Sequence, residues 1–131
     1  MPQFDGKSRL DFATSLPPLL RTAGSNGSAV DCSEAYRVAI FVQVGAITDG
    51  THTIKIQESD SSGSGFADVA AGDQLGSFVT LVANTNQVVS YIGSKRYLRA
   101  VNASSGSTGG NFGVVMVFSE LKRAPASATF P

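Results

Sequence analysis

Alternation of apolar and polar side chains predicts β-strands along much of this chain. The clearest run extends from Tyr36 to Ile47, and a second follows the turn pair Asp49-Gly50 over residues 52–58. Because successive side chains of a strand point to opposite faces, each run has one apolar face that we expect to meet the core. We predict that the two runs form a hairpin. The predicted core positions of the first run are Tyr36, Val38, Ile40, Val42 and Val44.

Further short strands are predicted downstream, each bounded by turn residues. Residues 66–69 follow a Ser/Gly loop and are expected to pair back as an edge strand. Residues 87–92 and 96–103 form two more strands, and residues 112–119 form the last, with Phe112, Val114, Met116 and Phe118 facing inward. Frequent turn signals without a long helical period predict an all-β domain, a β-sandwich or jelly roll.

The two ends of the chain break this pattern. Residues 1–28 hold no sustained period, and Pro17-Pro18 prevents a short helix from continuing. We predict an extended N-terminal arm over residues 1–28, a sandwich over residues 29–120 and a C-terminal tail over residues 121–131. Apolar residues of the arm and tail are candidates for contact with another surface: Phe4, Leu10, Phe12, Leu16, Leu19, Leu20 and Phe130.

Charge and hydropathy narrow the range of partners. Ten Lys and Arg balance ten Asp and Glu, so we expect no nucleic-acid partner, because such proteins usually carry a basic surface. The apolar runs fall far short of the ~20 residues that span a bilayer, so we expect no membrane partner. The first residues lack the pattern of a signal peptide, and we therefore expect synthesis in a cytoplasm.

One histidine and one cysteine limit the possible chemistry. A nucleophilic triad would need His52, Cys32 and either Asp31 or Asp49, but Cys32 lacks a setting that lowers a thiol pKa. We expect a packed thiol, an imidazole beside a turn and no catalytic residues. We also expect no cofactor or metal, since a zinc site needs several Cys and His ligands.

Residues 95–99 are the one concentration of basic side chains. On a strand, Arg96 would share a face with Leu98, and Tyr97 would share the opposite face with Arg99. We expect the arginines to pair with carboxylates or backbone carbonyls, within the chain or across a subunit boundary. Arg and Tyr are enriched at interface hot spots, so Arg96, Tyr97 and Arg99 are candidate interface residues.

Five segments carry a resemblance to a known family: Arg21–Ala23, Asn26–Asp31, Gly45–Asp60, Phe66–Ala70 and Gly93–Arg99. They resemble small virion proteins of tailed bacteriophages that are encoded near head genes. The resemblance implies a non-enzymatic capsid decoration or cement protein that is made in the host cytoplasm and binds the capsid surface. The expected partners are the major capsid protein and further copies of this chain.

Two alternatives stay open. The first is a head–tail connector or tail component with the same fold. The second is a carbohydrate-binding surface module, although sugar platforms are usually aromatic and this chain offers only Tyr36, Tyr91 and Tyr97, with no Trp.

Overall fold

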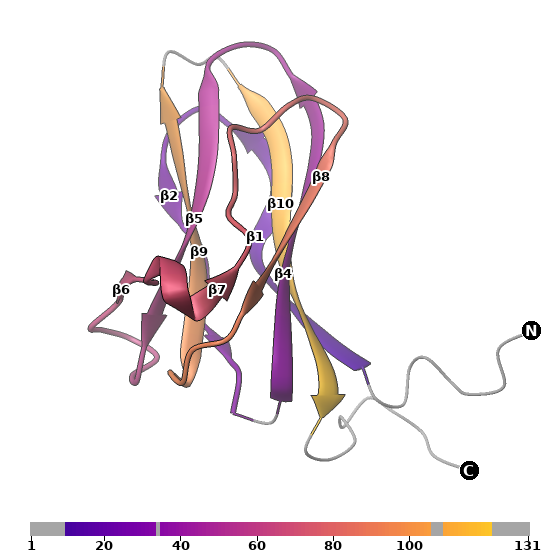
Figure 1. Ribbon diagram of the computed structural model, residues 1–131. Helices are drawn as coiled ribbons and strands as arrows, with labels where there is room; N and C mark the ends of the chain where they lie inside the picture. Colours follow the sequence, from indigo (N-terminus) through magenta and orange to yellow (C-terminus); the bar gives the residue numbers. More distant parts are fainter. Residues whose placement is uncertain (1–9, 34, 106–108, 122–131) are drawn as a thin grey trace, which may run out of the picture.

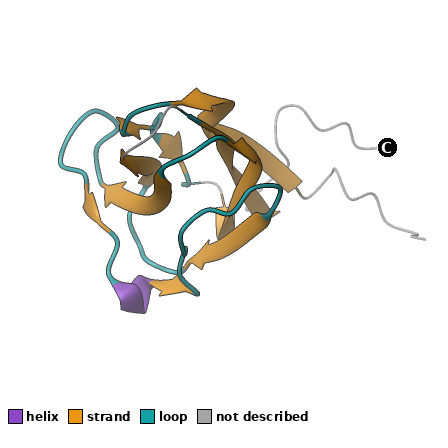
Figure 2. Cartoon of the chain, turned by 90° about the horizontal axis from the view of Figure 1, so that it is seen from above, coloured by secondary structure: helices purple, strands orange, loops and turns teal. Residues whose placement is uncertain are grey.

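The chain folds into two antiparallel sheets that pack face to face (Figure 1). The computed structural model describes residues 10–33, 35–105 and 109–121, apart from the side chains of Tyr36, Glu120 and Leu121. Seen from above, the strands of the two sheets lie around the interior of the domain (Figure 2). The predicted fold class, an all-β sandwich, is confirmed.

The strands alternate between the sheets more often than they pair with their neighbours in sequence. Sheet A has the order β1 (Leu10–Arg21), β10 (Gly110–Leu121), β4 (Ala35–Ile47), β8 (Asn86–Tyr91) and β7 (Gln74–Leu75). Sheet B has the order β2 (Ser25–Asn26), β9 (Tyr97–Ser105), β5 (Thr51–Ser59) and β6 (Ala67–Asp68), and β3 (Val30–Asp31) also pairs with β9. A short 3-10 helix, η1 (Ala71–Asp73), precedes β7.

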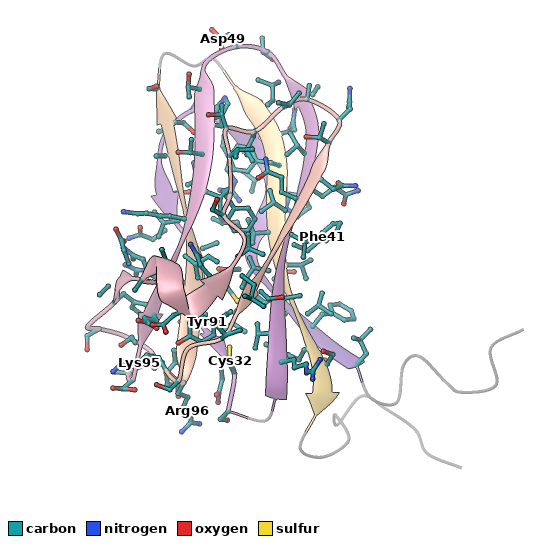
Figure 3. The ribbon with its side chains drawn as sticks, in the orientation of Figure 1. Cys32, Phe41, Asp49, Tyr91, Lys95 and Arg96 are labelled. Atoms are coloured by element: carbon teal, nitrogen blue, oxygen red, sulfur yellow. The ribbon has the colours of Figure 1, made fainter. Side chains whose placement is uncertain are left out.

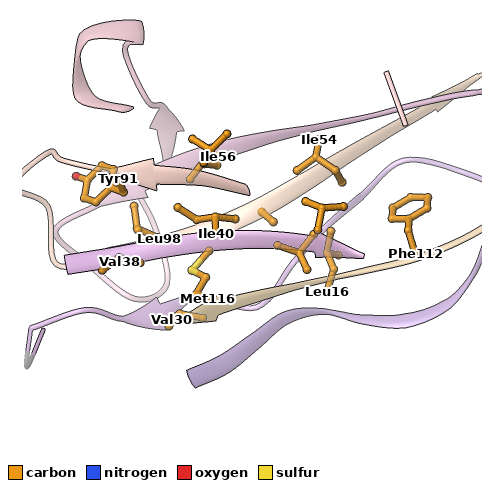
Figure 4. Packing of buried hydrophobic residues seen from close by; sticks show 14 of the residues in the cluster. Leu16, Val30, Val38, Ile40, Ile54, Ile56, Tyr91, Leu98, Phe112 and Met116 are labelled. Atoms are coloured by element: carbon orange, nitrogen blue, oxygen red, sulfur yellow. The ribbon is translucent and has the colours of Figure 1, made fainter. Parts of the chain in front are cut away.

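The core lies between the inward faces of the two sheets (Figure 4). Ile40 of β4 and Met116 of β10 are fully buried on one side, and Leu98 of β9 is fully buried on the other. The described residues that the alternation places inward are confirmed as buried: Val38, Ile40, Val42, Val44, Phe112, Val114, Met116 and Phe118. The predicted edge strand is also confirmed, since β6 pairs with β5.

The predicted hairpin over residues 36–58 is wrong. β4 pairs with β10 and β8 in sheet A, whereas β5 pairs with β9 and β6 in sheet B. The chain crosses between the sheets near Gly50, which has a φ of 85°. The two apolar faces therefore meet across the core instead of lying side by side in one sheet.

The predicted arm over residues 1–28 is wrong for residues 10–28. Leu10–Arg21 form an edge strand that pairs with β10, and β2 and β3 follow in sheet B. Register shifts on either side of Leu16 accommodate Pro17 and Pro18, whose missing N–H groups are tolerated at a sheet edge. Residues 1–9 and 122–131, with the candidates Phe4 and Phe130, lie outside the described residues.

Ser15 attaches this edge strand to sheet B. Its buried hydroxyl donates to the carbonyl of Ser28 at 2.8 Å and accepts from the amide of Ala100 at 2.9 Å. The Ser28 amide donates back to the Ser15 carbonyl at 2.8 Å, and the Gly27 amide donates to the Ala100 carbonyl at 2.7 Å. These bonds satisfy buried polar groups and fix β1 against β9.

Replacement of Gly27 by alanine should destabilise the fold. The new Cβ would lie 2.5 Å from Ser15 Oγ and 2.7 Å from the Ala100 carbonyl oxygen, and such overpacking costs about 1–3 kcal/mol of unfolding free energy. Urea unfolding followed by circular dichroism measures the loss. Gly63→Ala is the control, because a Cβ there meets nothing within 4 Å. Equal stability of the two variants would contradict the close packing at Gly27.

Candidate interaction surface

The outer face of sheet A, which is turned away from sheet B, is apolar at its centre. Strand register arranges its side chains in two neighbouring cross-strand rows: Thr14, Val115, Phe41 and Val88 in one, and Phe12, Val117, Ala39, Ser90 and Leu75 in the other. We name the apolar members of these rows the sheet A patch: Phe12, Ala39, Phe41, Leu75, Val88, Val115 and Val117.

Several patch residues are strongly exposed. Phe12 is 67% exposed, Leu75 is 62% exposed and Val88 is 59% exposed. Phe41 projects from β4 on the side away from sheet B (Figure 3). Gln43 and Asn86 border the patch on one side, and Arg37 and Ser119, with Leu10 in the same row, border it on the other. An apolar centre with a polar margin is the usual anatomy of a protein–protein interface.

A hollow of about 250 Å³ opens within the patch. Thr14, Pro18 and Phe41 contribute to its walls, and Gly113 lines it without a side chain. A Cβ at Gly113 would lie 2.9 Å from Pro18 Cα, so glycine allows β1 to pass closely over β10. The patch therefore combines a hollow with an exposed ring, that of Phe12.

The edge of sheet A at β1 is poorly suited to pairing with an added strand. The Phe12 amide donates to the Asp11 carboxylate at 2.9 Å, and Pro17 and Pro18 have no N–H to offer. Charged side chains, prolines and bulges are devices that protect sheet edges. A partner on this side of sheet A would therefore contact its face rather than extend the sheet at β1.

The outer face of sheet B is polar and internally paired. Lys55 lies 3.2 Å from Asp68, and the Gln57 side-chain amide donates to Asp68 at 2.9 Å. The side-chain oxygen of Gln57, Oε1, accepts two hydrogen bonds from Arg99, at 2.7 and 2.9 Å. The Arg99 guanidinium stacks over the Phe66 ring at 4.3 Å. Lys55, Gln57, Asp68 and Arg99 therefore find partners within this face.

The basic cluster finds its partners within the chain. Arg96 donates to both carboxylate oxygens of Asp31, at 3.1 and 2.9 Å, and lies 5.1 Å over the Tyr97 ring. Lys95 pairs with Asp60 at 2.8 Å. The expected pairing of an arginine with a carboxylate is confirmed for Arg96, while Arg99 binds an amide and an aromatic ring. The role of Arg96, Tyr97 and Arg99 at an interface stays a prediction.

The apolar candidates of the predicted arm divide between surface and core. Leu16 is 2% exposed and packs in the core, so it cannot contact a partner in the folded chain. Leu10 and Phe12 lie near the beginning of β1, whereas Leu19 and Leu20, 48% and 52% exposed, lie near its end. Sequence reasoning missed Phe41, Val88, Val115 and Val117, although apolar residues on both faces of a strand were a usable signal.

The residues considered for nucleophilic catalysis do not come together. His52 is fully buried, with Nδ1 2.8 Å from Ser104 Oγ and Nε2 2.9 Å from the Asp49 carbonyl oxygen. Cys32 lies at the opposite end of the sandwich from Asp49 (Figure 3). Burial, assisted by the nearby Asp31 carboxylate, raises the pKa of the Cys32 thiol to about 12. The packed thiol and the imidazole beside a turn are confirmed.

The tyrosines considered for sugar binding differ in their surroundings. Tyr91 is 7% exposed, and its hydroxyl donates to Glu58 at 2.7 Å and accepts from the Lys95 amide at 3.0 Å. Burial, and then the bond to Glu58, raises the pKa of Tyr91 above its ordinary value. Tyr91 is therefore a core residue, and Tyr97 stacks against Arg96.

The described part of the chain holds neither a cluster of metal ligands nor a helix that could span a membrane. Residues 10–33, 35–105 and 109–121 hold no group of three or more His, Cys, Asp and Glu side chains that could bind a metal ion. In the same ranges, no helix has the length and apolar character needed to cross a membrane.

Comparison with known proteins shows a shared fold. No protein-family model and no curated protein sequence matches the chain. Among solved structures, the chain is similar to the SPBc2 prophage-derived protein YomS, with 19% identity, a TM-score of 0.54, and coverage of 84% of this chain and 95% of YomS. At this identity, the likeness to YomS is one of fold.

Two virus structures match more loosely. A chain of infectious bursal disease virus, Gx strain, is 14% identical with a TM-score of 0.43, and the match covers 100% of this chain and 38% of that one. A chain from naturally occurring empty particles of cowpea mosaic virus is 10% identical with a TM-score of 0.41, and the match covers 100% and 93%.

The ion pair of Asp31 with Arg96 should make stability depend on pH. The hydrogen bond from Arg96 lowers the pKa of Asp31 from 3.8 to about 2, so the pair stabilises the fold above about pH 4 and loses this contribution as pH falls toward 2. Asp31→Asn should lower the unfolding free energy at neutral pH by about 1 kcal/mol or less, because the two side chains are 43% and 54% exposed.

Urea unfolding of both proteins at about pH 7 and about pH 2 measures this difference. We expect the deficit of Asp31→Asn to shrink at the lower pH. A deficit of the same size at both values would show that the ion pair is not its cause.

Proposed function

We propose that this chain is a structural virion protein that binds the outside of a tailed-phage head and stabilises the shell without catalysing a reaction. The observation that carries the proposal is the contrast between its two outer faces. Sheet B pairs its own charged groups, whereas the two central rows of sheet A expose apolar side chains and carry no charge among their described residues. Burial of apolar surface stabilises by about 25 cal/mol per Å², so such a face favours assembly.

Two further findings support a phage origin and a non-catalytic role. The fold is similar to that of a prophage-derived protein, and the family resemblance of residues 21–99 implies a decoration or cement protein. His52 and Cys32, which the sequence offers for catalysis, are buried in packing positions at separate places. We therefore propose the major capsid protein as the principal partner.

A decoration protein strengthens a shell when it bridges neighbouring capsid subunits. Several weak contacts made at once give high overall affinity, because each contact raises the effective concentration of the next. Leu19 and Leu20 are about half exposed near the end of β1, and we propose that they contact the capsid. Phe4 and Phe130 are proposed as further contacts in the terminal segments.

Particles of the phage that encodes this chain should carry it on the head in on the order of hundreds of copies, as expected for a symmetric shell. Quantitative mass spectrometry of purified particles, with immunogold labelling, measures copy number and location. About six or twelve copies at one vertex would instead support the head–tail connector or tail component. Absence of the chain from purified particles would overturn the proposal.

The paired substitution Leu19→Asp with Leu20→Asp should reduce binding to particles by about tenfold or more, because two carboxylates would have to be desolvated at the contact. Cosedimentation with particles that lack the chain measures the affinity. Val79→Asp is the control, since Val79 is 64% exposed on the loop between β7 and β8. Equal binding by the control and the paired variant would exclude Leu19 and Leu20 from the contact.

A further inference from the structure

We infer that the sheet A patch binds a second copy of this chain, face to face, in a symmetric dimer. The inference rests on the proposed role of this face in assembly. The patch binds the second copy, and the proposed capsid contacts, Leu19 and Leu20, lie outside the patch. The shape of the face, its charge and its edge each point to this occupant.

The face carries both an exposed aromatic ring and a hollow. Phe12 is the most exposed of the large hydrophobic side chains on the described surface, at 67%. Two residues further along β1 and on the same face, Thr14 lines the hollow of about 250 Å³, together with Phe41 and Val115. In a twofold arrangement, a contact from one copy is repeated by the other. The Phe12 ring of each copy then fills the hollow of its partner.

The centre of the face is uncharged, which favours a partner whose contacting surface is also uncharged. The described side chains of its two central rows carry no ionisable group, and Arg37 lies in the bordering row. A partner with charged groups at the centre would lose their hydration without gaining an ion pair, which is costly. A second sheet A patch meets this requirement. The chain has a formal net charge of zero, so two copies do not repel each other through net charge.

The edge of sheet A favours contact through the face. The Phe12 amide already donates a hydrogen bond to the Asp11 carboxylate. The two prolines of β1 lack the N–H groups that an added strand would need. Two sheets that pack face to face interdigitate their side chains at about 10 Å separation. Gln43, Asn86 and Ser119 at the margins then supply the polar rim of the interface.

Sedimentation equilibrium of the full chain over a range of micromolar concentrations tests the inference. We expect a dimer for the wild-type chain. Phe12→Asp and Val88→Asp should each raise the dimer Kd by about 30-fold or more, because each places a carboxylate in the apolar centre. Val82→Asp is the matched control: Val82 and Val88 are both 59% exposed, but Val82 lies on the loop before β8. Circular dichroism and urea unfolding verify that each variant is folded.

Several outcomes would overturn the dimer. It would be overturned if the wild-type chain stays monomeric or forms an oligomer larger than a dimer. It would also be overturned if the dimer survives Phe12→Asp, or if Val82→Asp weakens the dimer as much as Val88→Asp does. If the chain is monomeric and Phe12→Asp still abolishes binding to particles, the patch contacts the capsid, and the proposed function stands without the dimer. If the dimer forms as expected but the chain is absent from particles, the dimer stands and the proposed function fails.

Discussion

The packing of two sheets against each other requires apolar side chains on only one face of each strand. Inward positions such as Ile40, Leu98 and Met116 are fully buried and must be apolar for the core to form. Outward positions need not be apolar for the core to form. On sheet B they hold polar side chains such as Lys55, Asp68 and Arg99, which form hydrogen bonds on the outer face. Core packing therefore does not explain the apolar outward positions of sheet A, and these positions are the basis of the proposed binding surface.

The same packing gives the proposed interface a firm support. β1 carries Phe12 and one wall of the hollow, and an edge strand is ordinarily the least restrained part of a sheet. Here the hydroxyl of Ser15 and the close approach of Gly27 bind β1 to sheet B through buried hydrogen bonds. A surface held in its binding geometry before association loses less conformational entropy when it binds.

Local sequence pattern predicted six of the strands, β4, β5, β6, β8, β9 and β10, but only one of their pairings, that of β6 with β5. The alternation in residues 36–47 and 52–58 was sufficient to identify Val42 as a core residue and one apolar face in the second run. The same pattern fits a hairpin and a crossing between sheets equally well. Pro17 and Pro18 suggested an arm because a proline pair breaks regular structure, whereas at a sheet edge they cost no ladder bond. Leu16 consequently changed from a surface candidate to a core residue.

The sheet A patch was not predicted, because it too depends on which strands pair. Val115, Phe41 and Val88 become neighbours only through the pairing of β10, β4 and β8, and this register depends on contacts between residues far apart in sequence. Exposed apolar residues on one strand are unremarkable, but a continuous row across strands is informative. The interface roles of Phe4 and Phe130 stay predictions, since both lie outside the described residues.

The most direct test is a cryo-electron microscopy reconstruction of the assembled particle that resolves this sandwich and shows which face is covered. The account predicts that protein covers Phe12, Phe41 and Val88, while the Lys55–Asp68 pair on sheet B faces solvent. A reconstruction in which the outer face of sheet A is bare would contradict it.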